Sequence, residues 1–228
     1  MRPEHTDRKF DEELKRLRDM LIRMGGLIED QIEQSINSLV NRDATLAEAV
    51  IDRDKEVNQM DADVDDFCIR LLALHQPAAK DLRFVMTALK ITTDLERVGD
   101  IAVNISERSL ELMHEAPLKP YIDIPRMAGI AEKMVRDSLN AFIREDTSLA
   151  LKVCTEDQEI DDLNEQIFRE TVSYMIAEPK TINRAMKISF VSKYLERIAD
   201  HATNIAEMVV YMVKGKSIRH VEEVPPTI

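Results

Sequence analysis

The sequence predicts an all-α protein built from two tandem, similar antiparallel three-helix bundles, with six helices in all. The first observation is composition: 44% of the 228 residues are hydrophobic, aromatic residues make up only 4%, and there are five glycines. Sheets favour aromatic and β-branched residues, whereas this chain is rich in Met, Leu, Ala, Glu and Arg, which favour helices. The second observation is that apolar residues recur every three or four positions, and the third is an internal duplication.

The duplication has a spacing of about one hundred residues. Residues 95–107 align with residues 195–207, and eight of the 13 aligned pairs are identical. Unrelated segments of this length would match at about one position. Upstream the spacing is 103, as between Asp43 and Asp146, so a three-residue length difference falls near Pro77. The chain is therefore predicted to be two copies of one unit.

Helix boundaries in the first copy follow from capping and helix-breaking residues. A helix is predicted over about residues 7–41, with the Gly25-Gly26 pair as a weak or kinked point. Asp43 is predicted to cap a second helix that ends at His75 and Gln76. Pro77 is placed in the first turn of a third helix, which runs to about His114.

The second copy repeats these signals. Asp123 starts the fourth helix, Asp146 caps the fifth, and Glu178 with Pro179 opens the sixth. The prolines between the copies indicate a linker. The predicted organisation is a first three-helix repeat over 1–115, a linker over 116–122, a second three-helix repeat over 123–214 and a flexible tail over 215–228.

Each long helix carries an apolar seam with spacing of three and four. Such seams pack against neighbouring helices at shallow crossing angles, which is typical of antiparallel bundles. The seam of the third helix is Phe84, Ala88, Ile91, Leu95, Val98, Ala102, Ile105, Ser109 and Leu112. That of the sixth is Ile188, Val191, Leu195, Ile198, Ala202, Ile205, Val209 and Met212. That of the second is Leu46, Val50, Val57, Met60, Val64, Phe67, Leu71 and Leu74.

The charge and the cysteines exclude several classes of function. A net charge of −12 argues against nucleic-acid binding and against stable attachment to anionic lipid. It suits a partner with a basic surface. Cys68 and Cys154 occupy unrelated positions in the two copies and are expected to be buried and reduced. No signal peptide or membrane span is recognisable, so a cytoplasmic protein is expected, recruited to the inner membrane face by partners.

Acidic side chains fall outside the seams, at matching places in both copies. Glu96 and Asp100 lie one turn apart on the third helix, and Glu196 and Asp200 repeat them on the sixth. The stripes on the preceding helices are Asp54, Asn58, Asp61 and Asp65 in the first copy and Asp157, Asp161 and Asn164 in the second. Because each pair of helices forms a hairpin that turns at a proline, these stripes come level with each other. Asp54 is level with Asp100, Asn58 with Glu96, Asp157 with Asp200, and Asp161 with Glu196.

Four oxygen-bearing side chains are thus expected to converge at one level in each copy. Like charges one turn apart cost a few tenths of a kcal/mol, so a duplicated cluster suggests a compensating ligand. Hard and borderline cations prefer oxygen ligands, which predicts a divalent or ferric metal: iron, zinc, manganese or nickel. The alternative is a solvated face balanced by Arg97 and Arg197.

A ferritin-like di-metal enzyme would need Glu-x-x-His motifs that project inward from two helices. The match at Glu111 and His114 has no counterpart, because Tyr211 and Lys214 stand at the corresponding positions. No catalytic residues are predicted, and the chain is not expected to be an enzyme.

Three segments resemble the PhoU family: DLR at 81–83, DLERVGD at 94–100 and YLERIAD at 194–200. The resemblance covers nearly the whole chain, including its length, duplication and six helices. It implies a negative regulator of the bacterial phosphate-starvation response. Such a protein is an adaptor between the ATPase subunit of the phosphate ABC transporter and the sensor histidine kinase, and it restrains phosphate uptake. Some members of the family bind multinuclear iron or other metals at paired E(D)xxxD motifs on adjacent helices.

The resemblance also implies ligand sets. The second set is complete: Asp157, Asp161, Glu196 and Asp200. The first set is Asp54, Asn58, Glu96 and Asp100, in which Asn58 replaces an acid and so changes the charge of the site. Asp61, Asn104 and Asn204 are candidate secondary ligands.

Other functions stay open at the level of the sequence. The main alternative is a metal-binding helical protein, an iron or zinc store or a metal sensor, without a phosphate role. A helical scaffold with inert acidic faces is another, and phosphate binding at Arg97 and Arg197 is a third. A homodimer is expected because two elongated bundles leave long helix faces to cover, and no nucleic-acid partner and no direct membrane insertion are expected.

Overall fold

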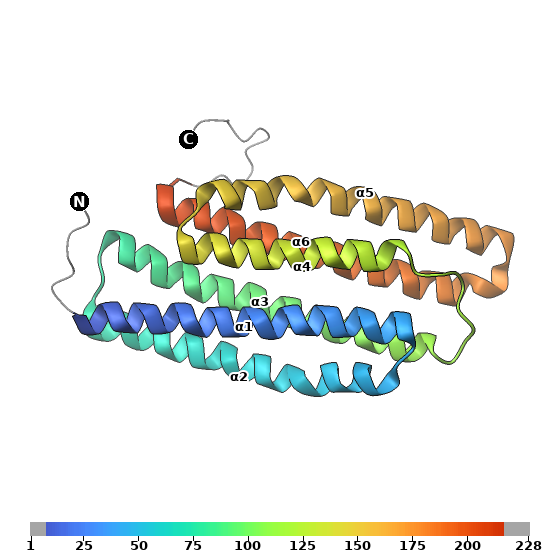
Figure 1. Cartoon of the computed structure of the whole chain (residues 1–228), viewed down its shortest axis with the longest axis horizontal. Helices are drawn as coiled ribbons and strands as arrows, with labels where there is room; N and C mark the ends of the chain where they lie inside the picture. The colour runs from blue at the N-terminus through green and yellow to red at the C-terminus, as the bar shows by residue number, and fades with distance from the viewer. Residues whose placement is uncertain (1–7, 217–228) are drawn as a thin grey trace.

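The computed structural model of the chain describes residues 8–216, which form six long α-helices and one short 3₁₀ turn without any strand (Figure 1). The all-α prediction with six helices is confirmed. The helices are α1 Arg8–Asn41, α2 Ala44–His75, α3 Ala79–Leu112, α4 Asp123–Arg144, α5 Thr147–Ala177 and α6 Ile182–Lys214, and the turn η1 is Pro179–Thr181.

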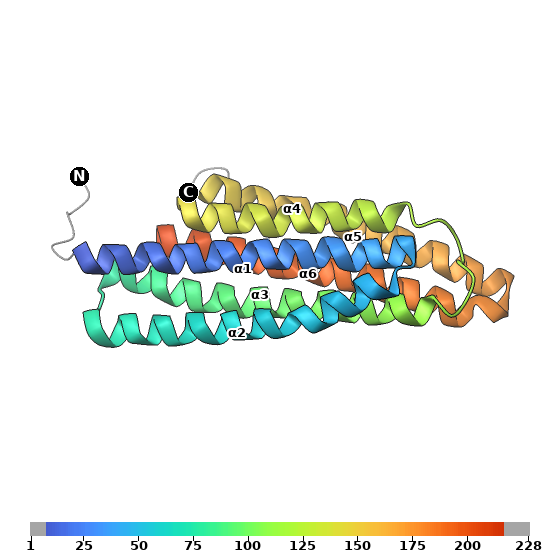
Figure 2. The same cartoon turned by 60° about the horizontal axis from the view of Figure 1, so that its bottom comes forward.

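The two repeats lie side by side along their length (Figures 1 and 2). Helices α1, α2 and α3 form one bundle and α4, α5 and α6 the other, and α1 packs on α4 while α3 packs on α6. The two bundles share one continuous apolar core. Helices α3 and α6 run antiparallel, and near one end of this contact the Arg83 Nε donates a hydrogen bond to the carbonyl oxygen of Met212 at 3.0 Å.

The turns between the first two helices of each repeat use the same device. Asp43 accepts a hydrogen bond from the backbone N–H of Leu46 at 3.0 Å, and Asp146 accepts one from that of Leu149 at 3.0 Å. Both caps were predicted, and both are confirmed. The flexible tail predicted over 215–228 lies almost wholly outside the described residues.

The two hairpin turns of the repeats differ, which accounts for their difference in length. The prediction that Pro77 lies in the first turn of α3 is wrong. Ala78 is extended, and the helix begins at Ala79. In the second repeat a 3₁₀ turn, Pro179–Thr181, leads directly into α6. Helix α3 also ends at Leu112, two residues before the predicted end.

The predicted seams of α3 and α6 are buried throughout. On α2 the seam is buried at Val50, Val57, Val64, Phe67 and Leu71, whereas Leu46 and Met60 are half-buried. At its end the prediction is wrong, because Leu74 is 64% exposed. His75 takes the inward position there: its ring packs on Phe10 with centroids 4.8 Å apart, and its Nε2 lies 2.5 Å from Glu13 Oε2. Because His75 contacts Glu13 and Phe10 on α1, it occupies the inward position and Leu74 is left exposed.

The glycine pair in α1 does not interrupt the helix. A Cβ added to Gly25 would lie 2.3 Å from Leu139 Cδ1 on α4, whereas one added to Gly26 would meet nothing within 4 Å. Gly25 thus allows α1 and α4 to approach closely, and the predicted weak point is a packing contact between the repeats.

Gln31 is a polar side chain in the core that the two repeats share. Gln31 on α1 is 0% exposed, and neither its Nε2 nor its Oε1 makes a hydrogen bond within the described part of the chain. Its Oε1 would lie 3.4 Å from a Cβ added to Gly99 on α3. The corresponding position of the second repeat is Met134, also 0% exposed. The fold therefore accommodates an apolar side chain of similar size at this place.

We predict that Gln31→Met raises the free energy of unfolding by about 1–3 kcal/mol, because a buried amide without partners carries a desolvation cost that methionine avoids. Urea denaturation of the two proteins measures the difference. The matched reverse change, Met134→Gln, should lower the unfolding midpoint. An unchanged or lower midpoint for Gln31→Met would show that the amide has partners in solution.

Candidate functional site

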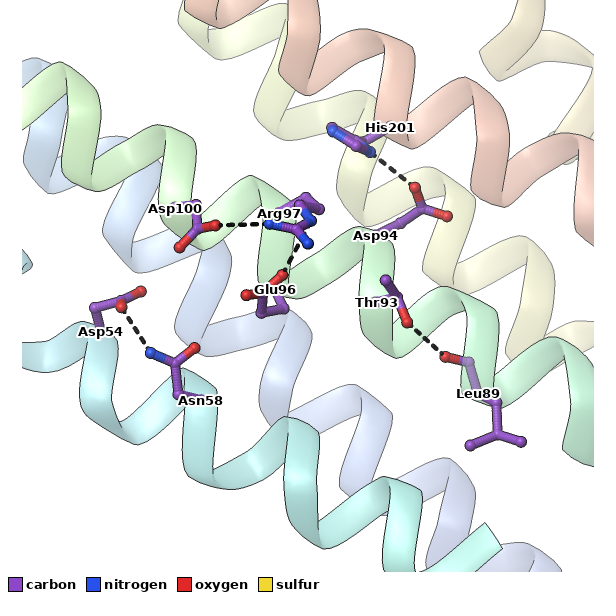
Figure 3. Close-up of polar contacts among 9 residues, drawn as sticks. All are labelled: Asp54, Asn58, Leu89, Thr93, Asp94, Glu96, Arg97, Asp100 and His201. Carbon is purple, nitrogen blue, oxygen red and sulfur yellow. Dashed lines mark hydrogen bonds and ion pairs between the residues drawn. The ribbon is translucent and has the colours of Figure 1, made fainter. Parts of the chain in front are cut away.

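The first cluster consists of Asp54 and Asn58 on α2 with Glu96 and Asp100 on α3, and these side chains face one another across the hairpin (Figure 3). Asn58 Nδ2 donates a hydrogen bond to Asp54 Oδ2 at 2.9 Å. Arg97 lies beside the two acids of α3, with its Nε 3.4 Å from Glu96 Oε2 and its Nη1 3.3 Å from Asp100 Oδ2. The first cluster is thus partly compensated by one guanidinium and one amide.

The acids of the first cluster are close enough to repel one another. Burial raises the pKa of Asp54 and the Asp100 carboxylate raises it further, while the hydrogen bond from Asn58 lowers it. Burial and Asp100 likewise raise the pKa of Glu96, against the opposing effect of Arg97. The mutual repulsion follows from the face-to-face arrangement of these acids.

The candidate secondary ligands lie beside the clusters. Asp61 is half-buried one turn from Asn58, and burial and the neighbouring Asp65 raise its pKa whereas Arg97 lowers it. Asn104 uses its Nδ2 to donate to the backbone carbonyl of Asp100 at 2.9 Å. Asn204 is half-buried, one turn beyond Asp200 on α6.

The second cluster consists of Asp157 and Asp161 on α5 with Glu196 and Asp200 on α6. Lys193 Nζ lies 2.6 Å from Glu196 Oε1 and 2.5 Å from its Oε2. Arg197, the counterpart of Arg97, makes no ion pair within residues 8–216. Four carboxylates therefore share one nearby lysine, so the second cluster is more negative than the first.

Burial and the excess of negative charge in the second cluster raise the pKa values of Asp157 and Asp200. Burial, together with the Asp161, Asp200 and Glu196 carboxylates, raises the pKa of Asp157 to about 6, although the nearby Thr203 hydroxyl lowers it. Burial and Glu196 also raise the pKa of Asp200, and Lys193 opposes them. A proton or another cation at this place would relieve the repulsion.

The donor atoms fit a hard or borderline cation. Asp54 Oδ1 in the first cluster and Asp157 Oδ1 in the second are buried, and neither accepts a hydrogen bond from the described residues, 8–216. Oxygen-only donor sets of this kind suit divalent or ferric ions. As the side chains stand, no three acidic, histidine or cysteine groups between residues 8 and 216 surround a single point, so the carboxylates would have to turn toward an ion to hold it.

Two further contacts were not predicted from the sequence. The pairing of Lys193 with Glu196 could have been inferred from its i,i+3 spacing. The contact of His201 Nδ1 with Asp94 Oδ1, 2.8 Å apart, joins α6 of the second repeat to α3 of the first (Figure 3). It depends on the register between the repeats, for which no local sequence signal exists.

The pattern of the PhoU domain matches residues 21–109 and 124–209, two segments that begin 103 residues apart and end 100 residues apart, as the internal repeat does. The chain belongs to the PhoU family. The phosphate-specific transport system accessory protein PhoU homologue of Pseudomonas aeruginosa is 39% identical over 218 residues, which cover 95% of this chain and 90% of that protein. The homologue with the same description from Aquifex aeolicus is 42% identical over 212 residues, which cover 93% of this chain and 96% of that protein.

Solved structures of PhoU proteins share the fold. The crystal structure of PhoU from Pseudomonas aeruginosa has a TM-score of 0.87 and 40% sequence identity, and the match covers 91% of this chain and 100% of that one. The phosphate transport system regulatory protein PhoU from Streptococcus pneumoniae has a TM-score of 0.86 and 29% identity, covering 92% and 99% of the two chains. The similarity therefore extends across both repeats.

We predict that Asp157→Asn stabilises the metal-free protein at about pH 7.5 and that this advantage narrows toward about pH 5. The folded-state pKa of about 6 lies above the ordinary aspartate value of 3.8, so the folded state binds the proton more tightly than the unfolded state does. The stability that this proton supplies is complete below the lower value and is lost as the pH rises through the higher one.

Thermal unfolding in chelator across this pH range measures the effect. Asp52→Asn is the control. The Asp52 side chain is 81% exposed, and its ion pair with Lys55, at 3.5 Å, is exposed as well. A stability difference between Asp157→Asn and wild type that stays constant with pH would contradict the assigned repulsion.

Proposed function

We propose that the chain is a negative regulator of the phosphate-starvation response. It acts as an adaptor between the phosphate ABC transporter, through its ATPase subunit, and the sensor histidine kinase of the two-component system, and it restrains phosphate uptake. The observation that carries the proposal is membership of the PhoU family across both repeats, with relatives described as accessory or regulatory proteins of phosphate transport.

The character of the clusters supports a binding role and not catalysis. Neither cluster contains a nucleophilic side chain in contact with a general base, which nucleophilic catalysis requires. His201 follows Asp200 in the sequence, but its ring Nδ1 pairs with Asp94 of the other repeat, which gives it a structural role. The net charge of −12 favours partners with basic surfaces.

The partners named above determine where the protein would act. No helix within residues 8–216 is both long and apolar enough to cross a membrane. We propose that the protein is cytoplasmic and reaches the membrane through the transporter and the kinase. We also propose that it is a homodimer.

We also propose that the clusters bind metal, because two carboxylate oxygens are buried without a hydrogen bond within residues 8–216, and burial together with mutual repulsion raises the pKa values of these acids. In the second cluster Asp157, Asp161, Glu196 and Asp200 would hold the ion; in the first Asp54, Glu96, Asp100 and the Asn58 carbonyl oxygen would do so. A bound divalent or ferric ion would supply positive charge where the chain provides little. The metal content of the purified protein tests this proposal.

We predict that deletion of the gene switches phosphate-starvation genes on in phosphate-rich medium, because the restraint on the kinase is lost. A reporter fused to a phosphate-starvation promoter measures the response, and a plasmid copy of the wild-type gene should restore repression. Unchanged reporter output in a confirmed deletion would overturn the regulatory role.

A further inference from the structure

The second repeat carries exposed apolar side chains on its α5–α6 hairpin. They are Phe168 on α5 and Ile182, Met186 and Phe190 on α6, and together they are called the apolar patch. The exposed fractions are 56% for Phe168, 43% for Ile182 and 46% for both Met186 and Phe190. The three residues of α6 are spaced by four, so they share one helix face. An exposed apolar patch of this kind commonly marks an interaction site.

The two aromatic side chains of the patch belong to the same level of the hairpin. One hydrogen bond between α5 and α6 joins Ser192 Oγ to Asn164 Oδ1 at 2.9 Å, and another joins Thr171 Oγ1 and Ser189 Oγ at 2.7 Å. Phe168 lies between Asn164 and Thr171 on α5, and Phe190 lies between Ser189 and Ser192 on α6. Phe168 and Phe190 therefore lie on adjacent helices, at levels within about one turn of each other along the axis.

The first repeat shows that the fold does not need aromatic residues at these places. The repeat offsets of 103 and 100 align Phe168 with Asp65 and Phe190 with Lys90. The first repeat forms the same hairpin with an acid and a base at this level. Because the first repeat forms its hairpin with charged residues there, the fold does not require the exposed aromatic pair of the second repeat.

The patch continues along α5 into the second cluster. Asp157, Asp161, Asn164 and Phe168 are spaced by four, three and four, which is one helix face. Asp161 is two turns from Phe168, or about 10 Å along the axis. On α6, Lys193 separates Phe190 from Glu196 and is already paired with that acid. A partner would therefore meet apolar side chains first and uncompensated carboxylates next.

We propose that this surface docks a basic amphipathic helix of a protein partner. The apolar face of such a helix would cover Phe168, Met186 and Phe190, and lysine or arginine side chains about two to three turns further along would reach Asp161 and Asp157. A symmetric contact with a second copy would instead bring two negative clusters together, and an anionic lipid surface would be repelled. The inference rests on the adaptor role only in supposing a protein partner.

The test uses a labelled peptide of about 14 residues, with leucine on one helix face and lysine on the other, and the full-length protein in chelator. The double variant Phe168→Asp/Phe190→Lys installs the pair found in the first repeat, so the fold should tolerate it. Leu82→Asn/Met86→Asn is the matched control, because these side chains are 40% and 42% exposed on the α3 surface of the first repeat. Fluorescence anisotropy reports the Kd, and light scattering reports the oligomeric state.

We expect the Phe168/Phe190 variant to bind the peptide about tenfold or more weakly than wild type, the control to bind like wild type, and added salt to weaken wild-type binding. Equal binding by the Phe168/Phe190 variant and wild type would overturn the proposal. So would a wild-type dimer that this variant dissociates, since the occupant would then be a second copy. If the Phe168/Phe190 variant loses peptide binding but still represses phosphate-starvation genes, the docking surface is supported and is not needed for the proposed regulatory function.

Discussion

The antiparallel register of two helix hairpins is the constraint on which the rest of this structure depends. Apolar seams fix how α2 lies against α3 and α5 against α6, and this register holds carboxylates of adjacent helices face to face. Their repulsion is sustained by burial of the seams, because each buried apolar side chain contributes about 1.5–3 kcal/mol and a like-charge pair costs far less. The packing energy of the bundle therefore maintains a cluster of mutually repelling carboxylates.

Duplication has produced two such places that are not equivalent. In the first cluster Arg97 and the Asn58 amide compensate the acids, whereas in the second Lys193 pairs with one acid, Glu196. The aromatic pair Phe168 and Phe190 adds a further difference, since the first repeat has charged residues there. The two repeats thus share a fold, but their surfaces suit different ligands or partners.

Much of this architecture could be predicted because helix period, caps and hairpin turns are local signals. Asp43 and Asp146 are caps as expected, and level positions across each hairpin follow from counting back from the turn. Contacts between the repeats could not be predicted in this way. The close approach at Gly25, the unpartnered Gln31 and the pairing of Asp94 with His201 depend on how one bundle meets the other. The exposure of Leu74 likewise depends on a partner for His75 on another helix.

The central claim is that the clustered carboxylates are binding sites, and metal content tests it most directly. The protein would be purified without chelator or affinity tag, alongside Glu196→Ala/Asp200→Ala, and both would be subjected to elemental analysis. The account predicts near-stoichiometric iron, zinc, manganese or nickel in wild type and loss of the metal of the second cluster in the variant. Occupancy at about a hundred times the Kd would also stabilise wild type by roughly 2.7 kcal/mol. Two metal-free proteins that stay empty after anaerobic loading would contradict the claim.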